Sequence, residues 1–484
     1  MEYDSIICFE THIELKTLSK LFCDCRVMYD APPNTHICPV CTGQPGALPV
    51  LNKKAVEYTI MAGLALNCTI NHVSEFARKN YFYPDLPKGY QISQYETPFC
   101  ENGFLEITGD NGESYPVGIK RIHLEEDAGK LVHSSKSFEE ADYSLVDYNR
   151  SSVPLIEIVC DHEKNPLRSI NEARTYLEKL RHILKYIGIS DCMMERGQLR
   201  CDVNISLRPK GSSTFGNRTE IKNMSSFRFI MDALESEINR QKEILNSGGH
   251  IDQETRLFDE TTKKTFPMRS KEDAPDYRYF PDPDLVEVNI DKRFIDNLRQ
   301  KMPELPDQYL NRIIEEFGIS KNDALIITKE KEISDFFSAC ASKCTDKKKL
   351  STWIIKELFR ILNDNSSALN KTKITPDRFS ALINMITSGE ITEAIGRCVL
   401  QEMLDSYDSP ATIVEKQGLK PVSDKETLKK ILTEVIEENA SVVEHIKSGE
   451  TKAVDFLVGQ IMKKTRGKAN AKKAKDLIYS ILKI

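Results

Sequence analysis

Near its start the chain reads Ile7-Cys8-Phe9-Glu10-Thr11-His12-Ile13-Glu14-Leu15. Side chains in a β-strand point alternately to opposite faces, so the odd-numbered positions, which are mostly apolar, share one face. The even-numbered positions place Glu10, His12 and Glu14 together on the other face. This alternation predicts a strand that has one face against a core and one polar, open face.

A second segment, Leu199–Arg208, has the same alternation and predicts an antiparallel neighbour. Its open face carries Arg200, Asp202, Asn204, Ser206 and Arg208. A helix is expected to begin at the cap Asn165-Pro166 and to run through Ile187, where Gly188 ends it. The apolar stripe of this helix can cover the buried face of the sheet.

Length and composition indicate a globular protein of several domains. The chain has 484 residues, 40% of them hydrophobic and 29% charged, and single cores stop growing at about 300 residues. Strand and helix patterns alternate up to residue 292, and helical patterns follow. We predict an α+β fold: a domain at 1–292 built on an antiparallel sheet, an all-α domain at 293–408 and a small helical tail domain at 409–484.

The sequence predicts neither a targeting segment nor a membrane segment. No window reaches about 18 consecutive apolar residues, and the first residues carry acids where a signal peptide would carry bases. We therefore expect a cytoplasmic protein without a membrane partner. The net charge of −6 argues against a protein that coats nucleic acid, but it allows a local basic surface.

Four of the thirteen cysteines have the spacing of a metal site. Cys23-x-Cys25 is followed, after twelve residues, by Cys38-x-x-Cys41, and the loop between them is rich in proline. Two close pairs of thiolates suit one tetrahedral zinc ion in a reducing compartment. A site with four protein ligands is structural, because no position is left open for catalysis. Four free thiols are the alternative.

Acidic residues on neighbouring strands indicate a second kind of metal site. Glu10 and His12 share a strand face, and more carboxylates follow at another strand end, in Arg121-x-His123-x-Glu125-Glu126-Asp127. Oxygen ligands with one imidazole suit Mg²⁺ or Mn²⁺ that carries a nucleotide's phosphates. A solvated acidic edge is the alternative, and spacing alone leaves both open. The chain has no GxxxxGK[ST] loop, so a nucleotide would have to be held by metal and basic side chains on a sheet.

The C-terminal end is locally basic. From Ile461 onward it has eight Lys and Arg against one acid. Such a cluster binds phosphate groups in nucleic-acid-binding proteins. The alternative interpretation is a helix face that only contacts solvent.

Long motifs occur in a fixed order along the first domain: Glu10–Cys23, Cys38–Pro49, Arg78–Gln94, Arg121–Lys130, Asp147–Arg150, Gly216–Asn223 and Arg269–Asp284. In this order they resemble the B subunits of the heterotrimeric aspartyl/glutamyl-tRNA amidotransferases. The tail, with Asn439, Lys447 and the segment from Gly459 to Ala469, is similar to that family's small tRNA-binding module. The resemblance spans essentially the whole chain.

The resemblance implies an ATP-dependent reaction on misacylated tRNA. ATP and Mg²⁺ would phosphorylate the side-chain carboxylate of Glu-tRNA(Gln) or Asp-tRNA(Asn), and ammonia would then displace the phosphate. The residues implied as Mg²⁺ ligands are Glu10, His12, Glu125, Glu126 and, as a further candidate, Glu220. Those implied to offset phosphate charge are Arg150, Arg200 and Lys222.

The resemblance also implies partners. Ammonia would come from an A subunit that hydrolyses glutamine, along a route that includes Lys79 and Lys88, and a small C subunit would complete the complex. The residues implied to contact tRNA are Lys463, Lys464, Arg466 and Lys468. The family's Asn-Arg-x-Gly reads Asn149-Arg150-Ser151-Ser152 here, and we expect Ser152 to alter that turn.

Two other functions compete with the enzyme. One is a tRNA-binding adaptor that has lost the kinase step, and the presence of Glu10, His12, Glu125 and Glu126 counts against it. The other is a free-standing metalloprotein scaffold for a protein partner.

Overall fold

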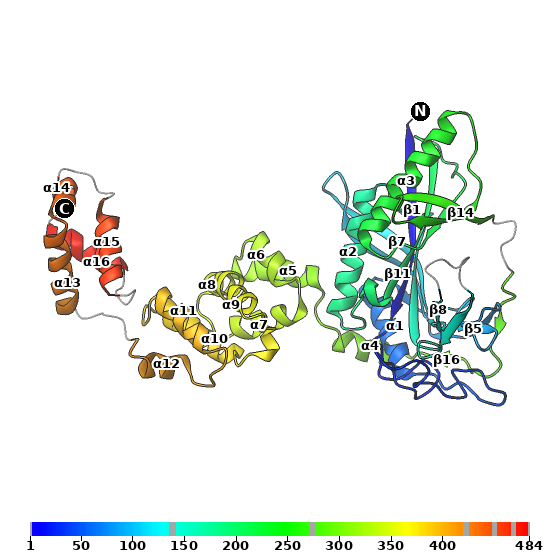
Figure 1. The fold of residues 1–484 in the computed structure, drawn as a ribbon, viewed down its shortest axis with the longest axis horizontal. Coiled ribbons are helices and arrows are strands. Elements are labelled where there is room, and N and C mark those ends of the chain that lie inside the picture. Colours follow the sequence, from blue (N-terminus) through cyan, green and yellow to red (C-terminus); the bar gives the residue numbers. More distant parts are fainter. Residues whose placement is uncertain are drawn as a thin grey trace. The chain divides into compact units, whose positions relative to one another are not determined.

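A computed structural model describes residues 2–134, 142–270, 276–419, 425–447, 453–465 and 471–482. The chain divides into two compact units, Met1–Leu305 and Pro306–Ile484. The first unit combines a large sheet with helices and the second is helical (Figure 1). The predicted α+β fold is therefore confirmed. The division into three domains at residues 292 and 408 stays a prediction.

The first unit is built on a nine-stranded sheet with the order β14-β13-β12-β11-β1-β10-β7-β6-β2. Its strands are β1 (Tyr3–Glu14), β2 (Thr69–Ile70), β6 (Cys100–Thr108), β7 (Ser114–Glu126), β10 (Pro154–Cys160), β11 (Leu199–Pro209), β12 (Thr219–Lys222), β13 (Glu254–Asp259) and β14 (Lys264–Ser270). Neighbours are antiparallel, as predicted, except for the parallel pair β12 and β13.

Shorter strands form three further sheets. They are β3 (Val73–Ser74) with β16 (Val288–Asn289), β8 (Lys130–His133) with β9 (Ser144–Asp147), and β4 (Ala77–Asn80) between β5 (Tyr90–Ser93) and β15 (Phe280–Pro281).

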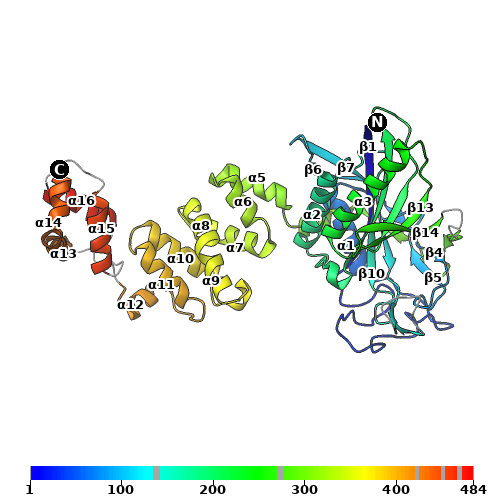
Figure 2. The same cartoon turned by 45° about the horizontal axis from the view of Figure 1, so that its top comes forward.

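Strand β1 lies in the middle of the large sheet and separates its two faces as the alternation predicts. Phe9 and Ile13 are fully buried, whereas His12 is partly exposed. Helices pack over the buried face (Figures 1 and 2), and they are α1 (Lys53–Ala65), α2 (Ile170–Tyr186) and α3 (Phe227–Asn246). Helix α4 (Lys292–Lys301) packs on α1. The opposite, open face of the sheet carries the polar positions of β1 and β11.

The predicted start of helix α2 is wrong. The helix begins at Ile170, and its cap is Ser169, not Asn165-Pro166. Leu167 fits the helical stripe by spacing, but it forms a β-bridge with Ile7. Its apolar side chain therefore enters the core from an extended segment, and apolar spacing alone could not distinguish the two conformations.

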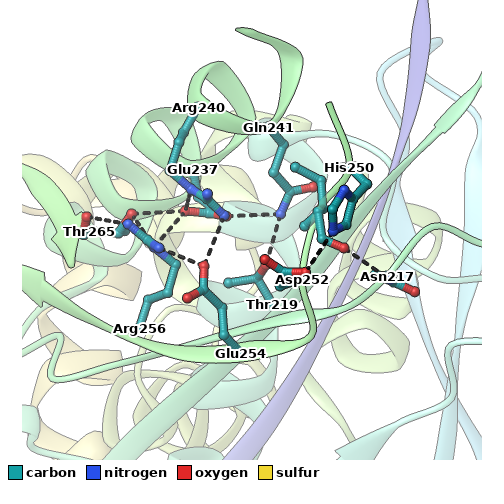
Figure 3. Close-up of polar contacts among 11 residues, drawn as sticks. Asn217, Thr219, Glu237, Arg240, Gln241, His250, Asp252, Glu254, Arg256 and Thr265 are labelled. Carbon is teal, nitrogen blue, oxygen red and sulfur yellow. Dashed lines mark hydrogen bonds and ion pairs between the residues drawn. The ribbon is translucent and has the colours of Figure 1, made fainter. Parts of the chain in front are cut away.

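A buried charged network holds α3 on the strands (Figure 3). Glu237 is fully buried on α3 and accepts hydrogen bonds from Arg240 and Gln241 of the same helix. Its carboxylate lies 3.5 Å from the guanidinium of Arg256 on β13. Gln241 also donates a hydrogen bond to Thr219 of β12. The network thus ties the parallel strands β12 and β13 to the helix that connects them.

The described residues of the second unit form two hydrophobic clusters, one around Phe337 and one around Leu457. The helical character predicted for the chain after residue 292 is confirmed among the described residues. The helices are α5 (Pro306–Phe317), α6 (Lys321–Ile327), α7 (Lys331–Ala341), α8 (Lys347–Trp353), α9 (Phe359–Asp364), α10 (Pro376–Thr387), α11 (Glu393–Glu402), α12 (Pro410–Lys416), α13 (Lys425–Glu438), α14 (Ala440–Lys447), α15 (Ala453–Lys464) and α16 (Ala471–Leu482). Among the described residues, no helix is both long and apolar enough to cross a membrane.

Candidate functional site

A row of charged side chains crosses four strands on the open face of the sheet. The register pairs His12 of β1 with Arg200 of β11 on one side and with Glu157 of β10 on the other. Glu157 in turn pairs with His123 of β7. Directly opposed residues have Cβ atoms about 5 Å apart, so imidazoles and a carboxylate meet along this row. Glu125 lies two residues further along β7 and joins them.

Two histidines and two glutamates, His12, His123, Glu125 and Glu157, are in mutual contact and are called the acidic cluster below. His12 Nε2 lies 3.6 Å from Glu157 Oε2 and 3.8 Å from Glu125 Oε1. His123 Nε2 lies 3.2 Å from Glu157 Oε2 and 3.4 Å from Glu125 Oε2. One ligand atom each from His12, Glu125 and Glu157 lies within 4.8 Å of the others. An imidazole and two carboxylates at this spacing fit a divalent cation such as Mg²⁺ or Mn²⁺.

Burial and charge act in opposite directions on this cluster. Burial alone would raise the pKa of Glu125 and of Glu157, but the histidines outweigh it and hold the pKa of both carboxyls below its usual value. Burial would lower the pKa of His123, but the two glutamates raise it to about 8. The glutamates therefore stay ionised at neutral pH, and in the absence of a metal His123 carries a balancing proton.

Glu10, Glu220 and Lys222 lie on the same face, toward β12. Glu10 accepts a hydrogen bond of 2.9 Å from Asn204, while burial and the neighbouring carboxylates raise the pKa of Glu10. Lys222 donates to Asp202 and lies 3.1 Å from Glu220. Burial alone would lower the pKa of Lys222, but these carboxylates raise it. The ammonium group of Lys222 is thus held in place beside the acidic cluster.

Arg150 and Arg200 converge on one buried carboxylate. Arg200 donates to Asp127 over 2.9 Å, and Arg150 Nε lies 3.6 Å from the other oxygen of Asp127. Arg150 also donates to the carbonyls of Ala128 and Gly129. Positive charge therefore lies at the end of the open face where β7 ends.

Glu126 lies apart from the other predicted metal ligands. Its carboxylate accepts hydrogen bonds from the backbone N–H of Ile92 over 2.9 Å and from Lys88. The pKa of Lys79, in contrast, depends on the acidic cluster. Burial alone would lower the pKa of Lys79, but Glu125 and other acidic groups raise it. The role of Glu126 as a metal ligand, and of both lysines on an ammonia route, stays a prediction.

A cavity of about 340 Å³ opens on the same face beside Glu10. Its charged and polar lining includes Glu10, Lys120, His162, Asn204 and Arg218. Small ligands occupy cavities of about 300–1,000 Å³. The basic side chains of this cavity suit a phosphorylated small molecule, and a divalent cation at the acidic cluster would lie next to its phosphates.

The four predicted thiols of the first unit are brought together. The Sγ atoms of Cys23, Cys25, Cys38 and Cys41 lie within 4.8 Å of one another. The backbone N–H of Cys38 donates to Cys41 Sγ over 3.2 Å. The cluster could bind a structural metal such as zinc, because four soft ligands surround one point.

The sequence does not predict two residues of the acidic cluster, His123 and Glu157, as ligands. His123 lies inside the motif that supplies Glu125, but the motif predicts no role for it. The sequence does not single out Glu157. Its signal was a single acid in the otherwise apolar strand Pro154–Cys160, and only the pairing of β10 between β1 and β7 shows that this acid faces both histidines.

Known proteins resemble the chain over its full length. A family model described as the GatB/GatE catalytic domain matches residues 5–296, and one described as a GatB domain matches residues 335–482. The chain belongs to the GatB family. Two relatives, from Persephonella marina and Carboxydothermus hydrogenoformans, are named as the B subunits of aspartyl/glutamyl-tRNA(Asn/Gln) amidotransferases, and each is 49% identical to this chain. These alignments cover 100% and 99% of this chain, and 100% and 98% of the relatives.

The second GatB match includes the basic tail. Lys463 and Lys464 end helix α15, and Lys464 pairs with Glu438 over 2.7 Å and with Glu434 over 3.1 Å. The other two predicted tRNA contacts, Arg466 and Lys468, lie outside the described residues. Contact between this tail and tRNA stays a prediction.

Proposed function

We propose that this GatB family member is the B subunit of a cytoplasmic tRNA-dependent amidotransferase and activates misacylated tRNA with ATP. Its substrates would be Glu-tRNA(Gln), Asp-tRNA(Asn) or both. The observation that carries the proposal is the cluster of His12, His123, Glu125 and Glu157 on an open sheet face, flanked by basic groups. The names of the relatives support the substrate class.

The chemistry requires a leaving group on a carboxylate. A carboxylate oxygen of the aminoacyl side chain attacks the γ-phosphorus of ATP, and ADP departs with the electrons of the broken phosphoanhydride bond. Ammonia then attacks the acyl carbon, and inorganic phosphate leaves as the amide forms. Phosphoryl transfer depends on positioning and charge neutralisation more than on covalent catalysis.

The residues of the open face would divide this work. Glu10, His12, Glu125 and Glu157 would hold the divalent cation, with Glu126 and Glu220 as the further predicted ligands. When bound, that cation neutralises phosphate oxygens. The groups that would offset the remaining phosphate charge are Arg150, Arg200 and Lys222. The cavity beside Glu10 would take the nucleotide.

The other parts of the reaction belong to partners. Ammonia would come from a glutamine-hydrolysing A subunit, past Lys79 and Lys88, in a complex with a small C subunit. The four cysteines would hold a structural zinc ion. The helical unit would bind tRNA by its shape and backbone, with Lys463, Lys464, Arg466 and Lys468 as phosphate contacts.

The test compares Glu157→Gln with Glu106→Gln in the complex purified with A and C subunits. Glu106 lies on β6 of the same sheet but is exposed. We expect Glu157→Gln to lower tRNA-dependent ATP hydrolysis and amidation roughly 100-fold, because a neutral amide replaces an anionic ligand of the cation, and Glu106→Gln to leave both unchanged. Wild-type complex that folds, binds Glu-tRNA and hydrolyses no ATP would establish the adaptor instead.

A further inference from the structure

The four-cysteine cluster has a fully buried lysine beside it. Lys20 is 0% exposed, and its ammonium donates hydrogen bonds to Cys41 Sγ over 3.4 Å and to the carbonyl of Tyr148 over 3.1 Å. We propose that Lys20 is a positioning residue that balances the charge of a metal held by the four thiolates and ties this metal site to the turn at residues 147–152. The inference rests on the proposed zinc site and assigns it a second role, the placement of Arg150.

Burial of Lys20 calls for negative charge nearby. An ammonium group taken out of water is destabilising unless a counter-charge compensates it. Among the described residues, its hydrogen-bond acceptors are Cys41 Sγ and the carbonyl oxygen of Tyr148, so the cysteine cluster is the source of negative charge that its ammonium contacts. One Zn²⁺ with four thiolates has a net charge of about −2. The buried ammonium therefore fits a metal-thiolate cluster, whose negative charge it offsets in part.

The metal loop and the turn at 147–152 are joined by hydrogen bonds. The backbone N–H of His36 donates to the side chain of Asn149 over 2.9 Å. Ser151 Oγ donates to the carbonyl of Cys41 over 2.9 Å. With the contact from Lys20 to Tyr148, these bonds link three parts of the turn to the loop that contains the cysteines.

The turn determines where Arg150 lies. Its guanidinium donates to the carbonyls of Ala128 over 3.1 Å and of Gly129 over 2.6 Å. It lies 3.6 Å from Asp127, the carboxylate that also binds Arg200. A displaced turn would therefore move one of the basic groups of the open face and leave Asp127 with one partner fewer.

The first experiment compares Lys20→Met with Lys16→Met in the full chain. Lys16 is a nearby lysine that is 61% exposed and pairs with Asp191 at the surface. We expect Lys20→Met to weaken zinc binding at least 10-fold in competition with a chromophoric chelator, and Lys16→Met to change it less than 2-fold. A smaller effect of Lys20→Met overturns the proposal. Absorption of the cobalt-loaded variants shows whether four thiolates still coordinate the ion.

The second experiment uses the unmodified chain and tests the link between the metal site and the turn, even where Lys20→Met does not fold. Zinc is removed with a chelator and then restored, and amide hydrogen exchange is measured in both states. We expect exchange at residues 148–153 to quicken at least 10-fold without zinc, and exchange in α2 to stay the same. Unchanged exchange at 148–153, or a purified chain without zinc, overturns the proposal. Neither readout uses ATP or tRNA, so failure here is distinct from failure of the amidation assay.

Discussion

Ser152 occupies a backbone conformation that suits glycine. Its φ is +67°, its side chain is buried, and its hydroxyl has no hydrogen-bond partner among the described residues. We expect Ser152→Gly to raise the free energy of unfolding by about 1 kcal/mol, because it relieves the left-handed strain and an unsatisfied hydroxyl. Urea denaturation measures this. Ser151→Gly is the matched control and should destabilise the chain, since Ser151 donates to the carbonyl of Cys41.

Glu14 should make stability depend on pH. Burial, and then Asp127, raise the pKa of Glu14 from 4.5 to about 7 in the folded chain. A carboxyl whose pKa is raised by folding contributes stability below about pH 4.5 that is lost as pH rises through 7. Glu14→Gln should therefore stabilise the chain more at pH 8 than at pH 5, by on the order of 1–3 kcal/mol.

Urea denaturation of the Glu14 variant at the two pH values measures that difference. Glu106→Gln, which changes an exposed strand carboxylate, is the control and should show no such dependence. An equal effect of Glu14→Gln at pH 5 and pH 8 would mean that the carboxyl titrates normally in the folded protein.

At the scale of the element, the packing of helix α3 on the sheet depends on Glu237. Glu237→Ala leaves Arg256, whose side chain is 9% exposed, without one of its partners, and it removes one acceptor each of Arg240 and Gln241. We expect a loss of about 3–5 kcal/mol, the usual effect of breaking a buried ion pair. Thermal or urea unfolding measures the loss. Glu235→Ala, on the exposed side of the same helix, should change stability by less than about 0.5 kcal/mol.

Elements that alternate regularly could be predicted, and those set by tertiary pairing could not. The alternation of β1 places Glu10 and His12 on the open face because period two is a local property. The start of α2 was wrong because Leu167 is apolar in either conformation and only its bridge to Ile7 distinguishes them. The parallel pair β12 and β13 likewise depends on the crossover through α3.

The same difference applies to the candidate site. The cysteines could be found because their spacing is local, and the structure brings all four together. Glu157 could not, since its contacts with His12 and His123 come from strands more than 30 residues away on one side and more than 140 on the other. Register between distant strands is not encoded in the spacing of either strand alone.

At the scale of the whole molecule, the proposed function assigns phosphoryl transfer and tRNA binding to different compact units. The acidic cluster and the cysteines lie within Met1–Leu305, and the basic tail lies within Pro306–Ile484. Among the described residues, the first unit has one hydrophobic cluster and the second has two, none of them shared between the units. A change in the tail should therefore affect tRNA binding and leave the reaction rate at saturation unchanged.

Neutralising Lys463 and Lys464 together, each to glutamine, tests this in the complex with A and C subunits. Each phosphate contact contributes about 0.9 to the slope of log K against log salt on duplex nucleic acid, so the slope should fall by up to about 2. The KM for misacylated tRNA should rise and kcat should stay constant. Lys416→Gln, which changes a surface lysine that pairs with Asp408 in the same unit, is the control. A slope equal to that of the wild type would mean that the tail lysines form a solvated helix face, since Lys464 already has two carboxylate partners.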